Sequence, residues 1–237
     1  MIAKSFSEAI VQMMEEIAKQ IPDSHRQEPV RAYLTGGGAV HYYCNSRVSD
    51  DVDLIMPFVV NIPRDLFVVW LNSEGKLEQV HYDHTYNSTF GLLHEDYEDR
   101  AVHMITIEDK FEIYLLAPED LIISKISRFA QNDEEDIQNI INTGKVSKER
   151  VYELADDAIR VGVGFREEWV RMNLDEVMEM FPKEENFLVP KLRLGIHTRA
   201  ITSLNIKFSY EFPNQIWELE KTKFGWSKKL LKRHLLQ

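Results

Sequence analysis

The feature that most constrains the fold is a run of three glycines, Gly36–Gly38, about thirteen residues before the acidic residues Asp51 and Asp53. Because glycine has no Cβ, a turn built from glycines lets the backbone approach a ligand closely. If a helix begins at such a turn, its free backbone N–H groups favour an anion, and a phosphate suits that place. We therefore predict a strand over 32–34, the glycine turn, and a short helix over 39–43.

The acidic pair marks the start of a second predicted strand, over 52–56. Alternate residues of a strand face the same side, so Asp51 and Asp53 would present two carboxylates together while Val52 faces the core. Two neighbouring carboxylates repel each other unless a cation lies between them, and oxygen ligands at a phosphate site favour magnesium. A glycine turn beside two carboxylates is what metal-assisted phosphoryl or nucleotidyl transfer requires.

Each motif alone also has a purely structural interpretation, since glycine runs are common in turns and Asp-x-Asp is common in loops and helix caps. Their order and spacing, with an apolar strand after the second Asp, favour the functional interpretation. Arg47 and Ser49 alternate with the acidic pair and have two interpretations as well. In the first they belong to a loop with a structural salt bridge, and in the second they brace the acidic pair or contact phosphate.

Together these residues resemble the signature of the polymerase-β-like nucleotidyltransferase superfamily. More closely, they are similar to the AbiEii-type nucleotidyltransferases, which include toxins of type IV toxin–antitoxin systems. The residues that carry the closer resemblance are Leu34, Gly36, Gly37, Ala39, Val40, Arg47, Ser49, Asp51 and Asp53. The family usually has Ser or Thr directly after the glycine pair, where this chain has Gly38. Without that hydroxyl, phosphate binding would be left to backbone N–H groups.

A second part of the resemblance lies farther along the chain, so that it covers about residues 30–140. The family carries a Pro-Glu-x-Leu-x-x-x-Lys helix, followed by a basic turn that ends in Asp-x-x-Asp. The corresponding residues of this chain are Pro118, Glu119, Leu121, Lys125, Arg128, Asp133 and Asp136. The family often has Lys directly before the first Asp, where this chain has Asn132.

Lys125 lies in the apolar stripe of this predicted helix, four residues after Leu121 and four before Phe129. A lysine at such a position either extends its charged end to water or pairs with an anion. If one helix continued to Asp136, that residue would lie roughly 16 Å from Lys125, too far for one small site. Either the helix breaks near residues 131–132, or only some of these residues reach a ligand.

The polar residues after this helix have two interpretations. Asn132 with Glu135 fits a capping pair for a new helix, and Asp133 can cap a helix as well. The resemblance instead implies that Asp133 and Asp136 belong to the catalytic site. It also implies that Lys125 is a cation that reaches the triphosphate or the acidic pair.

A third acidic residue is normally present on a later strand of the superfamily, where it would help to bind the metal or take the proton from the attacking hydroxyl. Asp96, which follows a predicted strand over 90–93, is the first candidate. Glu112, in a predicted strand over 111–115, is the second. Both residues have a plain alternative as surface charges in a polar stretch.

The resemblance thus implies a complete site. Its catalytic residues would be Asp51, Asp53, Lys125, Asp96, Asp133 and Asp136. Its nucleotide-binding residues would be Gly36, Gly37, Gly38, Arg47, Ser49 and Lys125. Asp51 and Asp53 would hold Mg²⁺, with Mn²⁺ as the alternative metal.

The predicted elements change character along the chain, from mixed helices and strands to helices alone. This order, with the resemblance, indicates an α+β fold: a polymerase-β-like nucleotidyltransferase core, in which helices flank a mixed sheet, and a C-terminal helical lobe. We expect a nucleotidyltransferase domain over 1–145 and a helical domain over 146–237. The other expected elements are helices over 5–20 and 63–71 and from 118 on, and a strand over 103–107.

The composition suits a protein of the reducing cytoplasm. A single cysteine excludes an internal disulfide and a multi-cysteine zinc site, and no apolar run approaches the roughly 18–20 residues of a membrane helix.

The net charge of the chain is −11 and is unevenly distributed. Residues 186–237 carry ten Lys or Arg and three Glu, a charge of +7 that leaves −18 for residues 1–185. The acidic body disfavours broad adhesion to nucleic acid. The basic tail is either a solvated face or a contact for a phosphate backbone or an acidic partner.

The sequence therefore favours a magnesium-dependent nucleotidyltransferase that moves a nucleoside monophosphate from an NTP to an acceptor, either RNA such as tRNA or protein. As a relative of toxins, it would have a cognate antitoxin as a partner. The alternative from another class is a catalytically silent protein of the same fold, which binds an NTP or a partner protein and transfers nothing.

Overall fold

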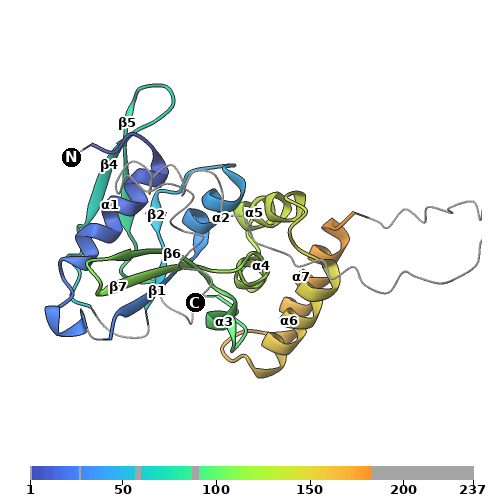
Figure 1. Cartoon of the computed structure of the whole chain (residues 1–237). Helices are drawn as coiled ribbons and strands as arrows, with labels where there is room; N and C mark the ends of the chain where they lie inside the picture. The colour runs from blue at the N-terminus through green and yellow to red at the C-terminus, as the bar shows by residue number, and fades with distance from the viewer. Residues whose placement is uncertain (1, 27, 57–59, 87–90, 183–237) are drawn as a thin grey trace, which may run out of the picture. The chain divides into compact units, whose positions relative to one another are not determined.

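The computed structural model describes residues 2–26, 28–56, 60–86 and 91–182 (Figure 1). The predicted α+β class is confirmed, because strands and helices mix up to residue 115 and helices follow to residue 180. Residues Met1–Phe181 form one compact unit. No helix within the described ranges has both the length and the apolar character needed to cross a membrane.

The strands of the described residues form two sheets that meet at Asp53. One sheet has the strand order β3-β1-β7-β6 and the other has the order β2-β5-β4. β2 and β3 lie directly before and after Asp53, so this residue connects the two sheets. The sheets are mixed, as expected: β1 runs parallel to β7 and antiparallel to β3. The strands are β1 (Val30–Leu34), β2 (Asp51–Val52), β3 (Leu54–Ile55), β4 (Phe67–Leu71), β5 (Leu77–Tyr82), β6 (Val102–Ile107) and β7 (Phe111–Leu115).

Helices flank these sheets and continue beyond them. The first, α1, begins after Ser5, whose side chain accepts a hydrogen bond from the backbone N–H of Glu8 at 3.2 Å. Its apolar face packs on β4 and β5. The helices are α1 (Phe6–Ala18), α2 (Gly36–Cys44), α3 (Tyr97–Arg100), α4 (Pro118–Ile126), α5 (Gln131–Asn142), α6 (Lys148–Val161) and α7 (Glu167–Met180), with a 3₁₀ turn over Asp23–Arg26.

Three predicted elements differ from the structure. In place of the single strand expected over 52–56, the chain forms β2 and β3, which lie in different sheets. Of the helix expected over 63–71, the second half forms β4, in which Val68 and Trp70 are buried and Phe67 is exposed. Such alternation of β-branched and aromatic residues suits a half-buried strand. The strand expected over 90–93 is wrong for residues 91–93, which form no strand, and residue 90 lies outside the described residues.

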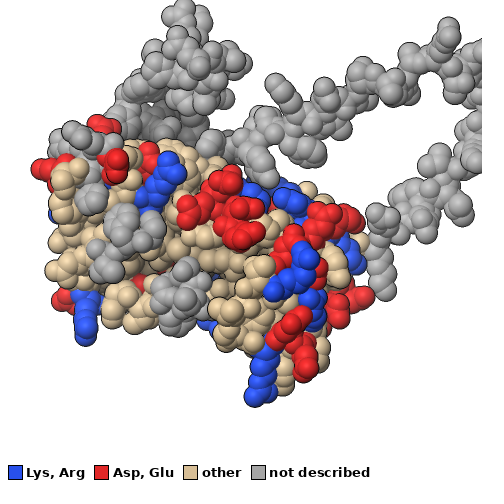
Figure 2. All heavy atoms as spheres, turned by 90° about the horizontal axis from the view of Figure 1, so that it is seen from below, with Lys and Arg blue, Asp and Glu red and all other residues tan. Residues whose placement is uncertain are grey.

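The helical part of the unit consists of α4 to α7. α6 and α7 both pack on α4, and α7 packs on α5 as well. Over α6 and α7, acidic and basic side chains lie side by side on the face shown in Figure 2, which agrees with the ion pairs within these helices. The division into domains at residues 145 and 146 stays a prediction, because residues 183–237 lie outside the described ranges.

Candidate active site

The glycine turn lies directly against the acidic strand. α2 begins at Gly36, whose φ of 60° lies in the left-handed region that favours glycine. A Cβ at this position would lie 1.8 Å from Oδ2 of Asp53, so the carboxylate occupies the space that a side chain would need. The backbone N–H of Thr35 also donates to the Asp53 carbonyl at 3.0 Å. The two motifs that were expected to act together are therefore in contact.

This contact makes a prediction about Gly36→Ala, with Gly75→Ala as the matched control. Gly75 also has a left-handed φ, 76°, but no atom lies within 4 Å of the position of its Cβ. The control should therefore show only the backbone cost, about 1–2 kcal/mol. Gly36→Ala should lose more than that in urea unfolding, and displacement of Asp53 should lower any transfer activity about 100-fold. Equal losses in the two variants would contradict the close contact.

The second glycine brings two more of the predicted residues to the turn. A Cβ on Gly37 would lie 2.9 Å from Ser49 Oγ and 3.2 Å from a terminal nitrogen of Arg47. A Cβ on Gly38 would instead face two apolar side chains of the interior, at 3.4 and 3.6 Å. Gly37 therefore borders the site, whereas the Cα of Gly38 faces the core.

A third carboxylate, Asp83, lies beside the acidic pair. β2 and β5 are parallel, with Asp51 paired to His81, and the backbone N–H of Asp83 donates to the Val52 carbonyl at 3.1 Å. Because neighbouring strands lie about 4.8 Å apart, the residues that directly follow these two strands, Asp53 and Asp83, are neighbours. The sequence analysis did not predict Asp83; the available signal was an acid directly after a strand-like alternation of apolar and polar residues.

The three carboxylates repel one another. Burial, and then the charges of Asp83 and Asp51, raise the pKa of Asp53 from its usual 3.8 to about 6. The cations Lys125 and Arg128 act on this pKa in the opposite direction. Burial and the charge of Asp83 also raise the pKa of Asp51. A bound cation would relieve this repulsion.

The donor set suits a partial magnesium shell. In the part of the chain described, no three Asp, Glu, His or Cys side chains already converge on one metal position. Magnesium commonly takes one or two carboxylates from a protein and completes its octahedron with phosphate oxygens and water. Asp51 and Asp53, at the glycine turn, fit that requirement.

The raised pKa of Asp53 predicts how stability depends on pH. Between about pH 4 and pH 6 the unfolded chain releases this proton before the folded chain does, so the folded state loses stability as the pH rises. Asp53→Asn removes that loss. In EDTA, the variant should match the wild type at pH 4 and exceed it by about 1–3 kcal/mol at pH 8, as measured by urea unfolding. A variant less stable at pH 8 would contradict the repulsion.

The predicted residues of α4 and α5 form a buried network of charges. Lys125 lies between two buried carboxylates, with Nζ 3.3 Å from Oδ1 of Asp133 and 2.8 Å from Oδ2 of Asp136. Arg128 donates twice to Asp133, at 2.7 Å for both bonds. Arg47 donates twice to Asp136, at 2.8 and 2.9 Å. The structural salt bridge, one of the two interpretations of Arg47, therefore exists, and it ties the loop before β2 to α5.

A break between α4 and α5 makes this network possible. The chain turns at Phe129, whose φ is 47°, so the continuous helix that would separate Lys125 from Asp136 does not form. A break near residues 131–132 was one of two alternatives; the helix does break, but at Phe129, and residues 131 and 132 already belong to α5. The proposed capping pair of Asn132 and Glu135 is not what begins α5. Instead, the side chain of Asp133 accepts the backbone N–H of Ala130 at 3.1 Å.

The pKa of Asp133 reflects these bonds. Burial alone would raise it, but the hydrogen bonds from Arg128 and the charge of Lys125 outweigh burial and lower the pKa below its usual value. The carboxylate is therefore held ionised, and it keeps both cations in place.

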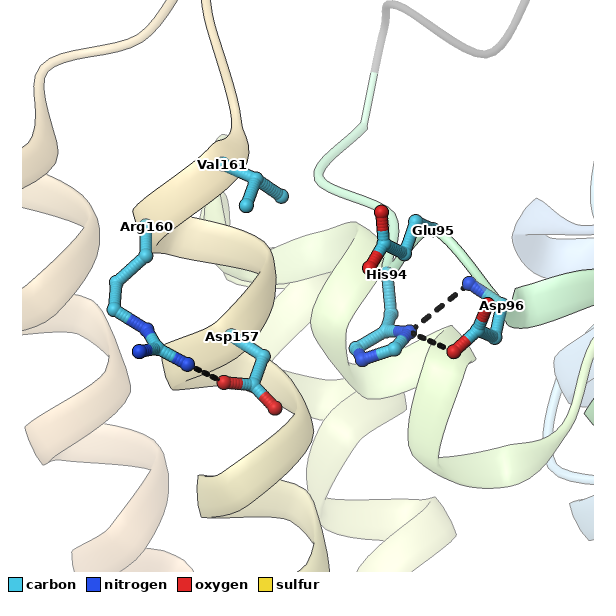
Figure 3. A pocket seen from close by; sticks show the side chains of 6 residues that line it. All are labelled: His94, Glu95, Asp96, Asp157, Arg160 and Val161. Atoms are coloured by element: carbon cyan, nitrogen blue, oxygen red, sulfur yellow. Dashed lines mark hydrogen bonds and ion pairs between the residues drawn. The ribbon is translucent and has the colours of Figure 1, made fainter.

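The structure places Asp96 in another part of the unit. Its side chain is 61% exposed, and its backbone N–H donates to Nδ1 of His94 at 3.0 Å. Figure 3 shows both residues on one side of a pocket of about 250 Å³, with Asp157 and Arg160 of α6 on the other side. Neither Asp51 nor Asp53 lines this pocket.

Glu112, the second candidate for a third acid, also lies apart from the glycine turn. In β7 it is paired with Arg31 of β1, and the two side chains form an ion pair at 3.3 Å. Arg31 precedes Leu34, where β1 reaches the turn, by three residues, or roughly 10 Å of strand. Glu112 therefore has a structural partner at the opposite end of β1.

Comparison with known proteins identifies a family and similar solved structures. The model of a family described as a nucleotidyltransferase of unknown function (DUF6036) matches residues 8–186. Among solved structures, the chain is similar to an antigenic nucleotidyltransferase-like protein from Paracoccidioides brasiliensis. The identity is 13%, the match covers 73% of this chain and 87% of that one, and the TM-score is 0.36. No protein of curated function matches the chain.

Proposed function

The chain belongs to this family of nucleotidyltransferases of unknown function (DUF6036), and we propose that it is a magnesium-dependent enzyme that transfers a nucleoside monophosphate from an NTP to an acceptor. The observation that carries this proposal is the position of the Asp53 carboxylate, 1.8 Å from where a Cβ of Gly36 would lie. The backbone that would bind phosphate thus lies against a carboxylate that would bind the metal.

The phosphates of the NTP would lie at the start of α2. The first backbone N–H groups of a helix have no partner within it, and the helix dipole favours an anion there. The missing side chains of Gly36 and Gly37 leave room for Asp53, Ser49 and Arg47 to lie against this turn. Arg47, whose terminal nitrogen lies near Gly37, and Ser49 complete the polar border of this turn.

Asp51 and Asp53 would hold the metal, with Mg²⁺ preferred and Mn²⁺ as the alternative. A metal bound there would supply Lewis-acid polarisation of the α-phosphate and would favour ionisation of the attacking hydroxyl. The support from this chain is its donor set beside the glycine turn: burial and the charges of Asp83 and Asp51 raise the pKa of Asp53, and burial and the charge of Asp83 raise that of Asp51.

Asp83 is our candidate for the acid that accepts the proton. The acceptor oxygen attacks the α-phosphorus, the bond from phosphorus to the bridging oxygen of pyrophosphate breaks, and the acceptor's proton moves to a carboxylate. Asp83 is the neighbour of Asp53 across β2 and β5, whereas Asp96 lines the pocket at α6. We therefore assign this role to Asp83 and not to Asp96.

Lys125, Asp133 and Asp136 remain part of the proposed site, as the buried charge network beside it.

The acceptor is either an RNA such as tRNA or a protein, and a cytoplasmic toxin with a cognate antitoxin is the role that the AbiEii resemblance favours. A transfer assay with each of the four α-³²P-labelled NTPs, on total tRNA and on the protein itself, tests the proposal. Label that moves in the wild type and is lost in Asp51→Ala supports it.

A second candidate is the catalytically silent nucleotide-binding protein. Gly38 favours it, because the residue supplies no hydroxyl after the glycine pair. Tight binding of NTP and Mg²⁺, with no label moved to either acceptor under Mg²⁺ or Mn²⁺, is the result that would replace the enzyme by this binding protein.

A further inference from the structure

Lys125 and Arg128 differ in how exposed their charged groups are, and therefore in how readily a ligand can reach them. The Lys125 side chain is 5% exposed, and two carboxylates already surround its ammonium group. The Arg128 side chain is 70% exposed. A buried cation with two anionic partners is largely compensated, whereas an exposed one beside the site can still bind an anion.

The guanidinium of Arg128 is also fixed in direction. Asp133 binds Nε and one terminal nitrogen, so the remaining N–H groups of the fork point away from Asp133. Among the described residues, no hydrogen bond of the other terminal nitrogen is found. Because Asp133 is itself held by Lys125, the arginine is preorganised and pays little entropy when it binds a ligand.

Arg128 belongs to the same site as the acidic pair. The ion-pair network connects it to the glycine turn, from Asp133 through Lys125 and Asp136 to Arg47. A terminal nitrogen of Arg47 lies 3.2 Å from the Cβ position of Gly37. At each end of the network, a buried aspartate thus holds the guanidinium of an arginine in a fixed direction.

On the basis of the proposed function, we propose that Arg128 binds the β- and γ-phosphates of the NTP, and that Lys125 is a positioning residue that holds Asp133. The departing group is pyrophosphate, which carries the negative charge that develops as the α-phosphorus bond breaks. A planar, fixed guanidinium suits two phosphate oxygens better than a buried ammonium does.

Isothermal titration of the full chain in Mg²⁺, with pyrophosphate, ATP and AMP as probes, tests this assignment. Arg128→Gln should weaken pyrophosphate and ATP binding about 10- to 100-fold and leave AMP binding within about twofold, because AMP lacks those phosphates. Arg128→Lys should recover part of the loss. Arg171→Gln is the control for lost charge, since Arg171 pairs with Asp156 and Glu167 in the helical part.

Lys125→Met should also weaken ATP binding. When it is combined with Arg128→Gln, the second substitution should cause no further loss of ATP affinity, because Lys125 acts by positioning Arg128. Equal pyrophosphate affinity in Arg128→Gln and Arg171→Gln, with both variants folded by circular dichroism, would overturn the assignment and leave the proposed function standing. A wild type that binds neither ATP nor pyrophosphate in Mg²⁺ would overturn both.

Discussion

Asp53→Asn should abolish nucleotidyl transfer, with a loss of about 10³-fold or more. The substitution keeps the size of the side chain but removes a negative charge from the metal-binding pair, and a metal in such a site supplies several kcal/mol of transition-state stabilisation. Because Asp53 lies against Gly36, the isosteric amide should fit without displacing the turn. The measurement is the initial rate of label transfer from α-³²P-labelled NTP to the acceptor.

Asp50→Asn is the matched control for this experiment. Asp50 is an exposed neighbour in the same segment, and its backbone carbonyl accepts the N–H of His81 at 2.8 Å, which the substitution leaves intact. The control should keep transfer within about a factor of three, as surface substitutions usually do. Transfer that survives in Asp53→Asn at the level of the control would exclude Asp53 from the reaction.

Asp136→Asn should produce the largest loss of stability, about 3–5 kcal/mol in urea unfolding. The Asp136 side chain is fully buried, and its two oxygens bind the guanidinium of Arg47 and the ammonium of Lys125. The amide removes the negative charge between two cations and leaves them repelling each other in a poorly hydrated place.

Glu135→Gln provides the comparison, since Glu135 is the exposed residue next to Asp136 on α5. The same change of carboxylate to amide should cost no more than about 0.5 kcal/mol there. A similar unfolding midpoint for the two variants would show that the buried network contributes little to the fold.

The contact between the glycine turn and Asp53 could be predicted because both motifs are short and lie close in sequence. Only a helix and a loop lie between β1 and the acidic segment, and β3, which directly follows Asp53, pairs antiparallel with β1. The break after α4 was predictable for a similar reason, since a distance along a helix follows from residue count alone.

Asp83 could not be assigned because its position depends on a pairing between distant segments. Asp53 and Asp83 become neighbours only through the parallel register of β2 and β5, and register is not encoded in either strand by itself. Asp96 was chosen from an expected strand over 90–93, and the described residues of that segment form none. No strand of a sheet therefore fixes the position of Asp96.

Other differences come from tertiary packing that overrides local preference. The proline at 63 suggested a helix start, but burial of Val68 and Trp70 against α1 favours the strand β4. Lys125 was expected to reach a ligand because a lysine on an apolar stripe needs an anion. The anions it binds are Asp133 and Asp136, which only the turn at Phe129 brings within reach.

The most direct test of the central claim is a crystal structure with Mn²⁺ and a non-hydrolysable NTP analogue. Our account predicts an anomalous manganese peak at the carboxylates of Asp51 and Asp53, with the triphosphate over the backbone of Gly36 and Gly37. A nucleotide bound elsewhere, or manganese peaks away from both carboxylates, would contradict it.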